Sequence, residues 1–189
     1  MSIPDTSRQY TYEDWSKWDG RWELINGKAY NMTPAPSSQH QFTVGELFFM
    51  IRSFFNNKNC LVFTAPFDVF FSESGDYESP DEITQPDIAV VCDKNQVTKQ
   101  GCNGSPTIIV EVLSPSTALK DYNEKFQAYE KYGVKEYWIV DPANRMVHVH
   151  SLHEGLYTKR VTYGDQDQLK SAIFDDLIIP LQPIFEFHT

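Results

Sequence analysis

The sequence predicts a mixed α/β fold built on a central β-sheet, and three observations carry that prediction. The runs 85–91, 106–113 and 136–142 are short and almost continuously apolar, which is typical of strands buried on both faces. Residues 38–56 place apolar side chains at helical spacing. A helical pattern separates the second run from the third, which favours a parallel strand–helix–strand crossover inside a mixed sheet.

The N-terminal third begins with a short helix and a hairpin. Residues 12–18 fit one or two helical turns with Thr11 as the N-cap. The segments 21–25 and 28–32 flank Asn26-Gly27, a pair that supplies the positive φ angles of a tight hairpin turn. Prolines at 34 and 36 end this pattern, and Ser37 or Ser38 can cap the long amphipathic helix that follows.

The remaining elements alternate between strands and loops. Residues 60–71 form one long strand or two pieces divided at Pro66, and the acidic stretch 72–84 is expected to be a loop. A helix over 117–132 ends at Gly133, in the place of a C-terminal capping glycine. A strand over 145–150 follows the third apolar run, and weak strand signals continue from Tyr157 to Phe187.

Length and composition predict a single domain over residues 1–189. The chain is 41% hydrophobic and 22% charged, which is ordinary globular composition. Its apolar runs are too short to span a membrane, and its start lacks the pattern of a secretory leader, so we expect a cytoplasmic protein without a membrane partner. The net charge of −10 argues against a basic nucleic-acid coat, so contact with a polyanion needs a local basic patch or bound cations.

The three cysteines, Cys60, Cys92 and Cys102, are an odd count without a Cys-x-x-Cys pair. This pattern supports neither a disulfide framework nor a zinc site. We therefore expect thiols.

Two carboxylates stand out because they interrupt apolar strands. Asp87 precedes Ile88-Ala-Val, and Glu111 lies between Val110 and Val112. Buried carboxylates need partners or a metal ion, and two at neighbouring strand ends would form an oxygen site for Mg²⁺ or Mn²⁺. The alternative is that each acid pairs with a basic side chain or caps a loop.

Three further residues could belong to the same site. Asp121, Lys125 and Tyr129 share one helix face, so Lys125 and Tyr129 could point over the sheet end. Alternatively, Asp121 and Lys125 form a surface pair of little energetic value. Glu23 alternates with Trp22 and Leu24 on the hairpin, where it either faces solvent or completes the acidic cluster.

Two other clusters have plainer interpretations. His148, His150 and His153 could bind a metal, but the open, water-facing side of a hairpin explains the pattern better. The acidic loop with Glu73, Asp76, Glu78, Asp81 and Glu82 lacks the alternation of a calcium-binding loop, so no ligand is assigned to it.

Several linked motifs resemble the Uma2 family, regarded as a branch of the PD-(D/E)XK nuclease-like superfamily. They are Trp22-Glu-Leu-Ile-Asn-Gly-Lys28, Gln85-Pro-Asp-Ile-Ala-Val90, Ile109-Val-Glu-Val-Leu-Ser-Pro-Ser-Thr117, the spacing of Asp121, Lys125 and Tyr129, and Gly133-Val-Lys-Glu-Tyr-Trp-Ile-Val-Asp-Pro142. The resemblance covers about residues 10–185. It implies a restriction-endonuclease-like core with an N-terminal hairpin, C-terminal strands and a metal site at one end of the sheet.

The resemblance implies catalytic roles for Asp87, Glu111 and Lys125. Leu113 stands where the superfamily pattern has its lysine, so the resemblance implies that this lysine has moved to the next helix as Lys125. Asp87 and Glu111, with Glu23 at the family's N-terminal acidic position, would hold Mg²⁺ or Mn²⁺. The supporting residues would be Gln85, Ser114 and Tyr129.

These roles imply a metal-dependent endonuclease that cleaves nucleic acid, most simply DNA. Two alternatives stay open: a catalytically silent nuclease-fold module that only binds, and an enzyme for a smaller phosphodiester. The sequence leaves the oligomeric state open, a homodimer included.

Overall fold

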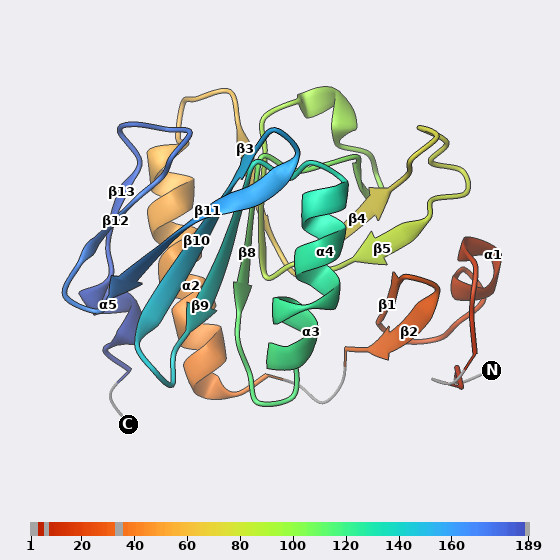
Figure 1. The fold of residues 1–189 in the computed structure, drawn as a ribbon, viewed down its shortest axis with the longest axis horizontal. Coiled ribbons are helices and arrows are strands. Elements are labelled where there is room, and N and C mark those ends of the chain that lie inside the picture. Colours follow the sequence, from red (N-terminus) through yellow and green to blue (C-terminus); the bar gives the residue numbers. More distant parts are fainter. Residues whose placement is uncertain (1–3, 6–7, 33–35, 188–189) are drawn as a thin grey trace.

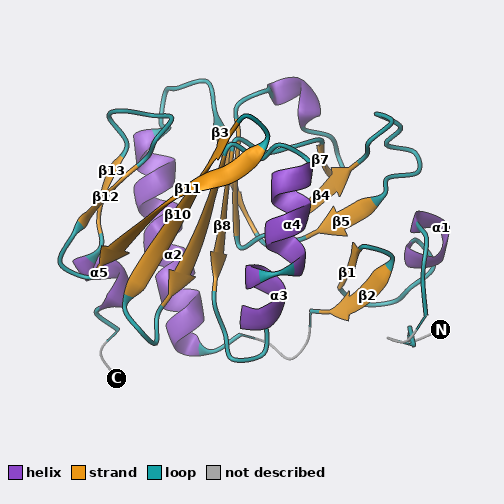
Figure 2. Ribbon diagram, viewed as in Figure 1, coloured by secondary structure: helices purple, strands orange, loops and turns teal. Residues whose placement is uncertain are grey.

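The computed structural model describes residues 4–5, 8–32 and 36–187, and its main element is a six-stranded mixed sheet with helices on both faces (Figures 1 and 2). The strand order is β11-β10-β9-β8-β6-β3. This arrangement confirms the predicted fold class. The strands are β3 (Leu61–Thr64), β6 (Ile88–Val91), β8 (Ile108–Val112), β9 (Glu136–Asp141), β10 (Met146–His153) and β11 (Leu156–Gly164).

The helices cover opposite faces of this sheet because the strand side chains alternate. Val110 and Val112 pack in one core cluster with Leu47 and Ile51 of the long helix, whereas Ile109 packs in another with side chains of the second crossover helix, residues 124–131. The helices are α1 (Tyr12–Trp15), α2 (Ser38–Phe54), α3 (Ala118–Tyr122), α4 (Glu124–Lys131) and α5 (Gln182–Phe185), with a 3₁₀ turn η1 (Lys94–Gln96). Among the described residues, none of these helices has the length and apolar character required to cross a bilayer.

The predicted crossover is confirmed, with one difference. β8 and β9 are parallel neighbours, and α3 and α4 lie between them in sequence. The single helix expected over 117–132 is broken at Asn123, where the backbone leaves helical geometry (φ −117°, ψ −77°). Gly133, at φ +82°, follows α4 as expected of a capping glycine.

A second, five-stranded sheet was not predicted. Its order is β2-β1-β5-β4-β7, and its strands are β1 (Trp22–Ile25), β2 (Lys28–Asn31), β4 (Asp68–Phe71), β5 (Glu82–Thr84) and β7 (Gly101–Asn103). The hairpin at Asn26-Gly27 is confirmed, and the 60–71 stretch is two strands, one in each sheet. The prediction of a loop over all of 72–84 is wrong at its end, because β5 pairs with both β1 and β4.

The C-terminal region adds a two-stranded sheet and closes one core. β12 (Gln168–Lys170) pairs with β13 (Ile178–Pro180), and Leu169 and Ile179 are buried against the face of the large sheet that α2 covers.

The water-facing interpretation of the histidine cluster is wrong for His150. Its side chain is 7% exposed, and its ring lies 5.0 Å from that of Phe126 in α4. The strand pattern did not reveal that a helix covers this part of the hairpin.

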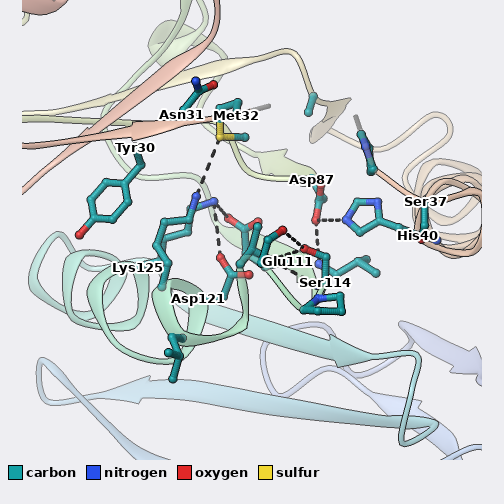
Figure 3. A pocket seen from close by; sticks show the side chains of 18 of the residues that line it. Tyr30, Asn31, Met32, Ser37, His40, Asp87, Glu111, Ser114, Asp121 and Lys125 are labelled. Carbon is teal, nitrogen blue, oxygen red and sulfur yellow. Dashed lines mark hydrogen bonds and ion pairs between the residues drawn. The ribbon is translucent and has the colours of Figure 1, made fainter. Parts of the chain in front are cut away.

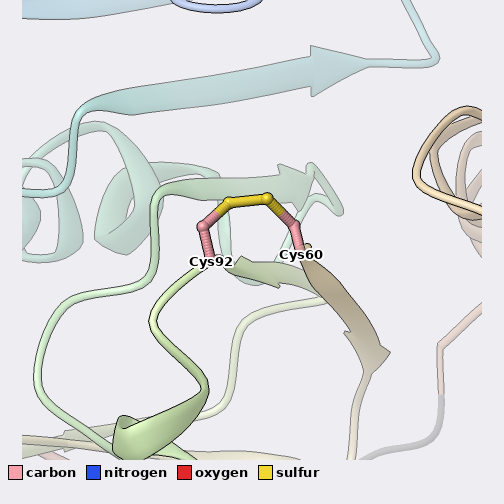
Figure 4. Close-up of a disulfide and its surroundings, with 2 residues drawn as sticks. All are labelled: Cys60 and Cys92. Atoms are coloured by element: carbon pink, nitrogen blue, oxygen red, sulfur yellow. A yellow bond between two sulfur atoms is a disulfide. The ribbon is translucent and has the colours of Figure 1, made fainter. Parts of the chain in front are cut away.

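A disulfide joins Cys60 and Cys92, so the expectation of thiols at these positions is wrong (Figure 4). The residues next to them, Leu61 and Val91, are partners in the antiparallel β3–β6 pair, which brings the two cysteines opposite each other. A separation of 32 residues carried no sign of this register. Cys102 is a free, buried thiol.

Candidate active site

A cavity of about 640 Å³ opens at one end of the large sheet. It lies where β6 begins, β8 ends, and α2, α3 and α4 come together with the end of β2. Figure 3 shows that the side chains of Asp87, Glu111, Asp121 and Lys125 converge here. The three residues expected to be catalytic, Asp87, Glu111 and Lys125, therefore line one cavity.

Asp87 lies directly before β6, and the antiparallel pairing of β6 with β8 carries it to the end of β8. Its Oδ2 accepts a hydrogen bond from the Val112 amide at 2.7 Å and lies 3.3 Å from His40 Nε2. Its side chain is 18% exposed. Asp87 is thus held by one backbone bond and one imidazole while remaining open to the cavity.

Glu111 and Lys125 form a buried ion pair between strand β8 and helix α4. Lys125 Nζ lies 2.7 Å from Glu111 Oε1, and the Tyr129 hydroxyl donates to the same oxygen at 2.7 Å. Alternation along β8 turns Glu111 away from α2 and towards α4, where Lys125 and Tyr129 are one helical turn apart. Tyr129, expected to be a supporting residue, contacts Glu111 directly.

Glu23 is fully buried, so the solvent-facing alternative for it is wrong. Its Oε1 lies 2.8 Å from Lys125 Nζ and accepts from the Gln85 amide, and its Oε2 lies 2.5 Å from Lys120 Nζ. Asp121 Oδ1 lies 3.8 Å from Lys125 Nζ, and both side chains are 2% exposed. The surface-pair alternative for Asp121 and Lys125 is therefore wrong as well.

Burial and the uneven distribution of lysines separate the pKa values of these acids. Burial raises the pKa of Glu111 to about 8 and that of Asp121 to about 6, because Lys125 offsets it only in part. Burial also acts on Glu23, but Lys125 and Lys120 together outweigh it and lower its pKa to about 2. Burial disfavours the charged form of Lys125, yet the carboxylates around it raise its pKa well above the ordinary value.

The remaining expected residues form a layer behind these groups. The Gln85 side chain accepts two hydrogen bonds from Arg21, at 3.0 and 2.8 Å, and donates to Asp68 at 2.6 Å. Ser114 shares hydroxyl hydrogen bonds with Ser116 and Thr117 in the loop before α3. Gln85 thus fixes the approach to β6, and Ser114 braces the loop at the cavity wall.

Two cavity residues carried no role in the sequence analysis. His40 follows the N-cap Ser37 by three residues, so the first turn of α2 directs it at Asp87. Lys120 comes from α3 and bonds Glu23, 97 residues away in sequence. The first turn of α2 is polar throughout, Ser38-Gln-His-Gln41, so its pattern did not single out His40. Lys120 carried no signal either, because its partner lies in the other sheet.

The donor set fits a hard divalent cation held by two carboxylates. Among the described residues, no three His, Cys, Asp or Glu side chains are arranged as a metal site. Mg²⁺, however, often binds through one or two carboxylates and keeps several waters. The carboxylates of Glu23, Asp87, Glu111 and Asp121 outnumber the ammonium groups of Lys120 and Lys125, and Asp121 Oδ1 has no hydrogen bond within the described part of the chain.

Asp87 and Glu111 fit such a cation better than Glu23 does. Both hydrogen bonds described above for Glu111 end on Oε1. Both oxygens of Glu23 are bound by lysines. This geometry favours a role for Glu23 in holding Lys125.

Carboxylates and a lysine at one end of a mixed sheet are the arrangement expected of a restriction-endonuclease-like protein, and the family match supports a nuclease-like protein of this class. The Uma2 family model, described as "Putative restriction endonuclease", matches residues 10–182. The chain belongs to the Uma2 family.

The fold is also found in a solved structure. The crystal structure of a "putative nuclease belonging to DUF820" from Anabaena variabilis superposes with a TM-score of 0.74 at 19% identity, over 93% of this chain and 97% of that chain. No curated protein matches the chain.

Proposed function

We propose that the protein is a metal-dependent endonuclease that hydrolyses phosphodiester bonds in DNA. The observation that carries the proposal is the 2.7 Å contact between Lys125 and Glu111 inside a cavity that Asp87 also lines. Two carboxylates and a lysine at the end of a sheet suit hydrolysis of a phosphodiester with a bound cation. Family membership supports a nuclease-like activity.

Each residue has a role that follows from its contacts. Asp87 and Glu111 would hold Mg²⁺ or Mn²⁺, which when bound supplies Lewis-acid activation of water and neutralises phosphate charge. Lys125 presents its ammonium group at the cavity wall, where it orients the attacking water and stabilises charge that develops on the phosphate oxygens. Glu23 and Tyr129 fix Lys125 and Glu111 in place.

The negative charge of the chain makes a bound cation necessary for this proposal, because the carboxylates that line the cavity outnumber its cationic side chains. Arg21, Lys120 and Lys125 line it. Asp87, Glu111, Asp121 and Glu124 line it as well. A bound metal ion would therefore have to supply the positive charge that a phosphodiester needs in a protein with a net charge of −10.

The test is cleavage of supercoiled plasmid DNA in Mn²⁺ or Mg²⁺, with and without chelator. We expect nicking that needs the metal and is lost in Asp87→Asn, Glu111→Gln and Lys125→Met. Glu82→Gln is the matched control, because Glu82 is a buried glutamate, 2% exposed, that does not line the cavity. Its activity should equal that of the parent.

Two results would contradict the proposal. Cleavage that survives all three substitutions combined in one protein would belong to another site or a contaminant. Folded parent protein that binds DNA without cutting it in either metal would instead identify a catalytically silent binding module. The pairing of both Glu23 oxygens with lysines, which keeps Glu23 from binding a metal ion, would suit such a module.

A further inference from the structure

Helix α3 exposes apolar side chains beside the cavity. Leu119 is 80% exposed and lines the cavity, and Tyr122, three residues later, is 38% exposed. Residues three apart lie on neighbouring parts of a helix surface. Helix α3 therefore leaves both of its large apolar side chains accessible beside the cavity.

The exposed ring of Tyr122 lies beside the outer strands of the large sheet. Its centroid lies 6.2 Å from that of His148 in β10, and His148 Nδ1 is 2.9 Å from the hydroxyl of Thr162 in β11. Arg160 of β11 is exposed and lies opposite His150 of β10 in the strand register. This position is next to the His148–Thr162 position on the same face of the sheet.

Arg160 acts electrostatically on both rings. Burial raises the pKa of Tyr122 and lowers that of His148. The Asp141 carboxylate raises the pKa of both groups, and the Arg160 charge lowers both. The rings of Tyr122 and His148 therefore lie next to each other near Leu119, and the charges of Arg160 and Asp141 both act on them.

We propose that Leu119, Tyr122, His148 and Arg160, which we call the α3 face, bind single-stranded DNA that leads into the cavity. Unpaired bases offer flat apolar surfaces to such side chains, and the guanidinium suits the backbone phosphates. A duplex hides its bases and would rely on broad positive charge, which a chain with a net charge of −10 is poorly suited to supply.

Inside the cavity, too, an aromatic ring lies near a cationic group. Tyr30 and Lys120 line it, and Lys120 Nζ lies 5.6 Å from the centre of the Tyr30 ring. The position of the α3 face as an entry to the active site rests on the proposed nuclease function, but DNA binding by this face is measured without cleavage.

The experiment measures fluorescence anisotropy of a labelled 20-nucleotide strand and of the matching duplex, in EDTA and at one fixed salt concentration. We expect the single strand to bind at least tenfold more tightly than the duplex. Leu119→Ser and Tyr122→Ser should each weaken single-strand binding about fivefold or more. Phe49→Ser is the matched control, because Phe49 is 67% exposed on α2, which covers the opposite face of the large sheet, and its variant should bind like the parent.

An oligonucleotide with abasic sites tests the stacking with unaltered protein. It should bind the parent protein about as weakly as the intact strand binds Tyr122→Ser. Equal affinity for single strand and duplex, or unchanged binding by both α3 variants, would overturn the inference. Strand binding with these properties alongside absent cleavage in metal would overturn the proposed nuclease function and leave the α3 face as a binding site.

Discussion

Lys125 shows how a single charged residue can be buried in this fold. Its side chain is 2% exposed and lies within 4 Å of Glu111, Glu23 and Asp121. Burial of an ammonium group is costly, and the three carboxylates offset that cost. If the lysine is removed, the buried carboxylates lose their shared partner. The residue is therefore needed for stability as well as for the proposed chemistry.

Replacing Lys125 by methionine should lower the free energy of unfolding by about 3–5 kcal/mol, because three carboxylates would then face one another without their shared partner. Urea unfolding of the metal-free protein measures this. Lys17→Met removes an exposed pair with Glu13 and should have a much smaller effect. A Lys125 variant as stable as Lys17→Met would mean that the cluster is not charged as described.

His150 should make stability depend on pH. Burial, with the charges of His148 and Arg160, lowers its pKa from 6.5 to about 4. The unfolded chain therefore binds a proton near pH 6.5 that the folded chain refuses until about pH 4, so stability is lost as the pH falls through this window.

At pH 4.5 the loss attributable to His150 should be about 2–3 kcal/mol relative to pH 7. We expect His150→Phe to remove this part of the pH dependence, measured as the difference between parent and variant in urea unfolding at both pH values. His153→Gln, at an exposed position, should keep the dependence of the parent. Parallel pH profiles for the parent and His150→Phe would show that His150 titrates normally.

At the scale of elements, the strands of the large sheet could be predicted from the sequence better than the five-stranded sheet as a whole. The three apolar runs, the hairpin and the crossover follow from local patterns of burial and turn residues. The five-stranded sheet does not, because β5 and β7 are three residues long and form through partners distant in sequence. The same limit hid Lys120 and left the environment of Glu23 open.

One glycine in the five-stranded sheet lies so close to the neighbouring strand that no side chain fits there. Gly101 in β7 has φ +154°, and a Cβ there would lie 2.1 Å from the Asp68 carbonyl oxygen in β4. A Cβ on Gly45, inside helix α2, would meet no heavy atom within 4 Å beyond the backbone of its own helix. The two glycines should respond in opposite directions to the same substitution.

Gly101→Ala should destabilise the protein by about 2 kcal/mol or more, since β7 must move away from β4. Gly45→Ala should stabilise it by about 0.5–1 kcal/mol, because alanine loses less backbone freedom in a helix. Thermal and urea unfolding of the two variants, compared with the parent, measure both changes. A Gly101 variant of parental stability would place β7 elsewhere.

At the scale of the whole molecule, the disulfide and the ion cluster tie distant parts of the chain together. Cys60–Cys92 links β3 to β6, the strand that begins just after Asp87. The cluster joins Glu23 of the five-stranded sheet to Glu111 of the six-stranded sheet through Lys125. Neither link could be predicted from sequence spacing, because each depends on the register of the folded sheets.

Reducing the disulfide should cost about 3–4 kcal/mol of stability, the chain-entropy value for a loop closed by residues 32 apart. Urea unfolding with and without reductant tests this, with Cys102→Ser as a control that still contains the disulfide. Thiol titration in denaturant should find one free thiol before reduction and three after it. Three thiols in unreduced protein would contradict the disulfide.

The site carboxylates also have backbone reporters. The Gln85 amide donates to Glu23 Oε1 at 2.9 Å, and the Val112 amide donates to Asp87 Oδ2 at 2.7 Å. The chemical shift of each amide proton depends on the charge of the carboxylate it contacts. In an NMR spectrum of the unaltered protein, a cation held by Asp87 would shift the Val112 signal, and one held by Glu23 would shift that of Gln85, so two resonances could separate the two ligand assignments without any substitution.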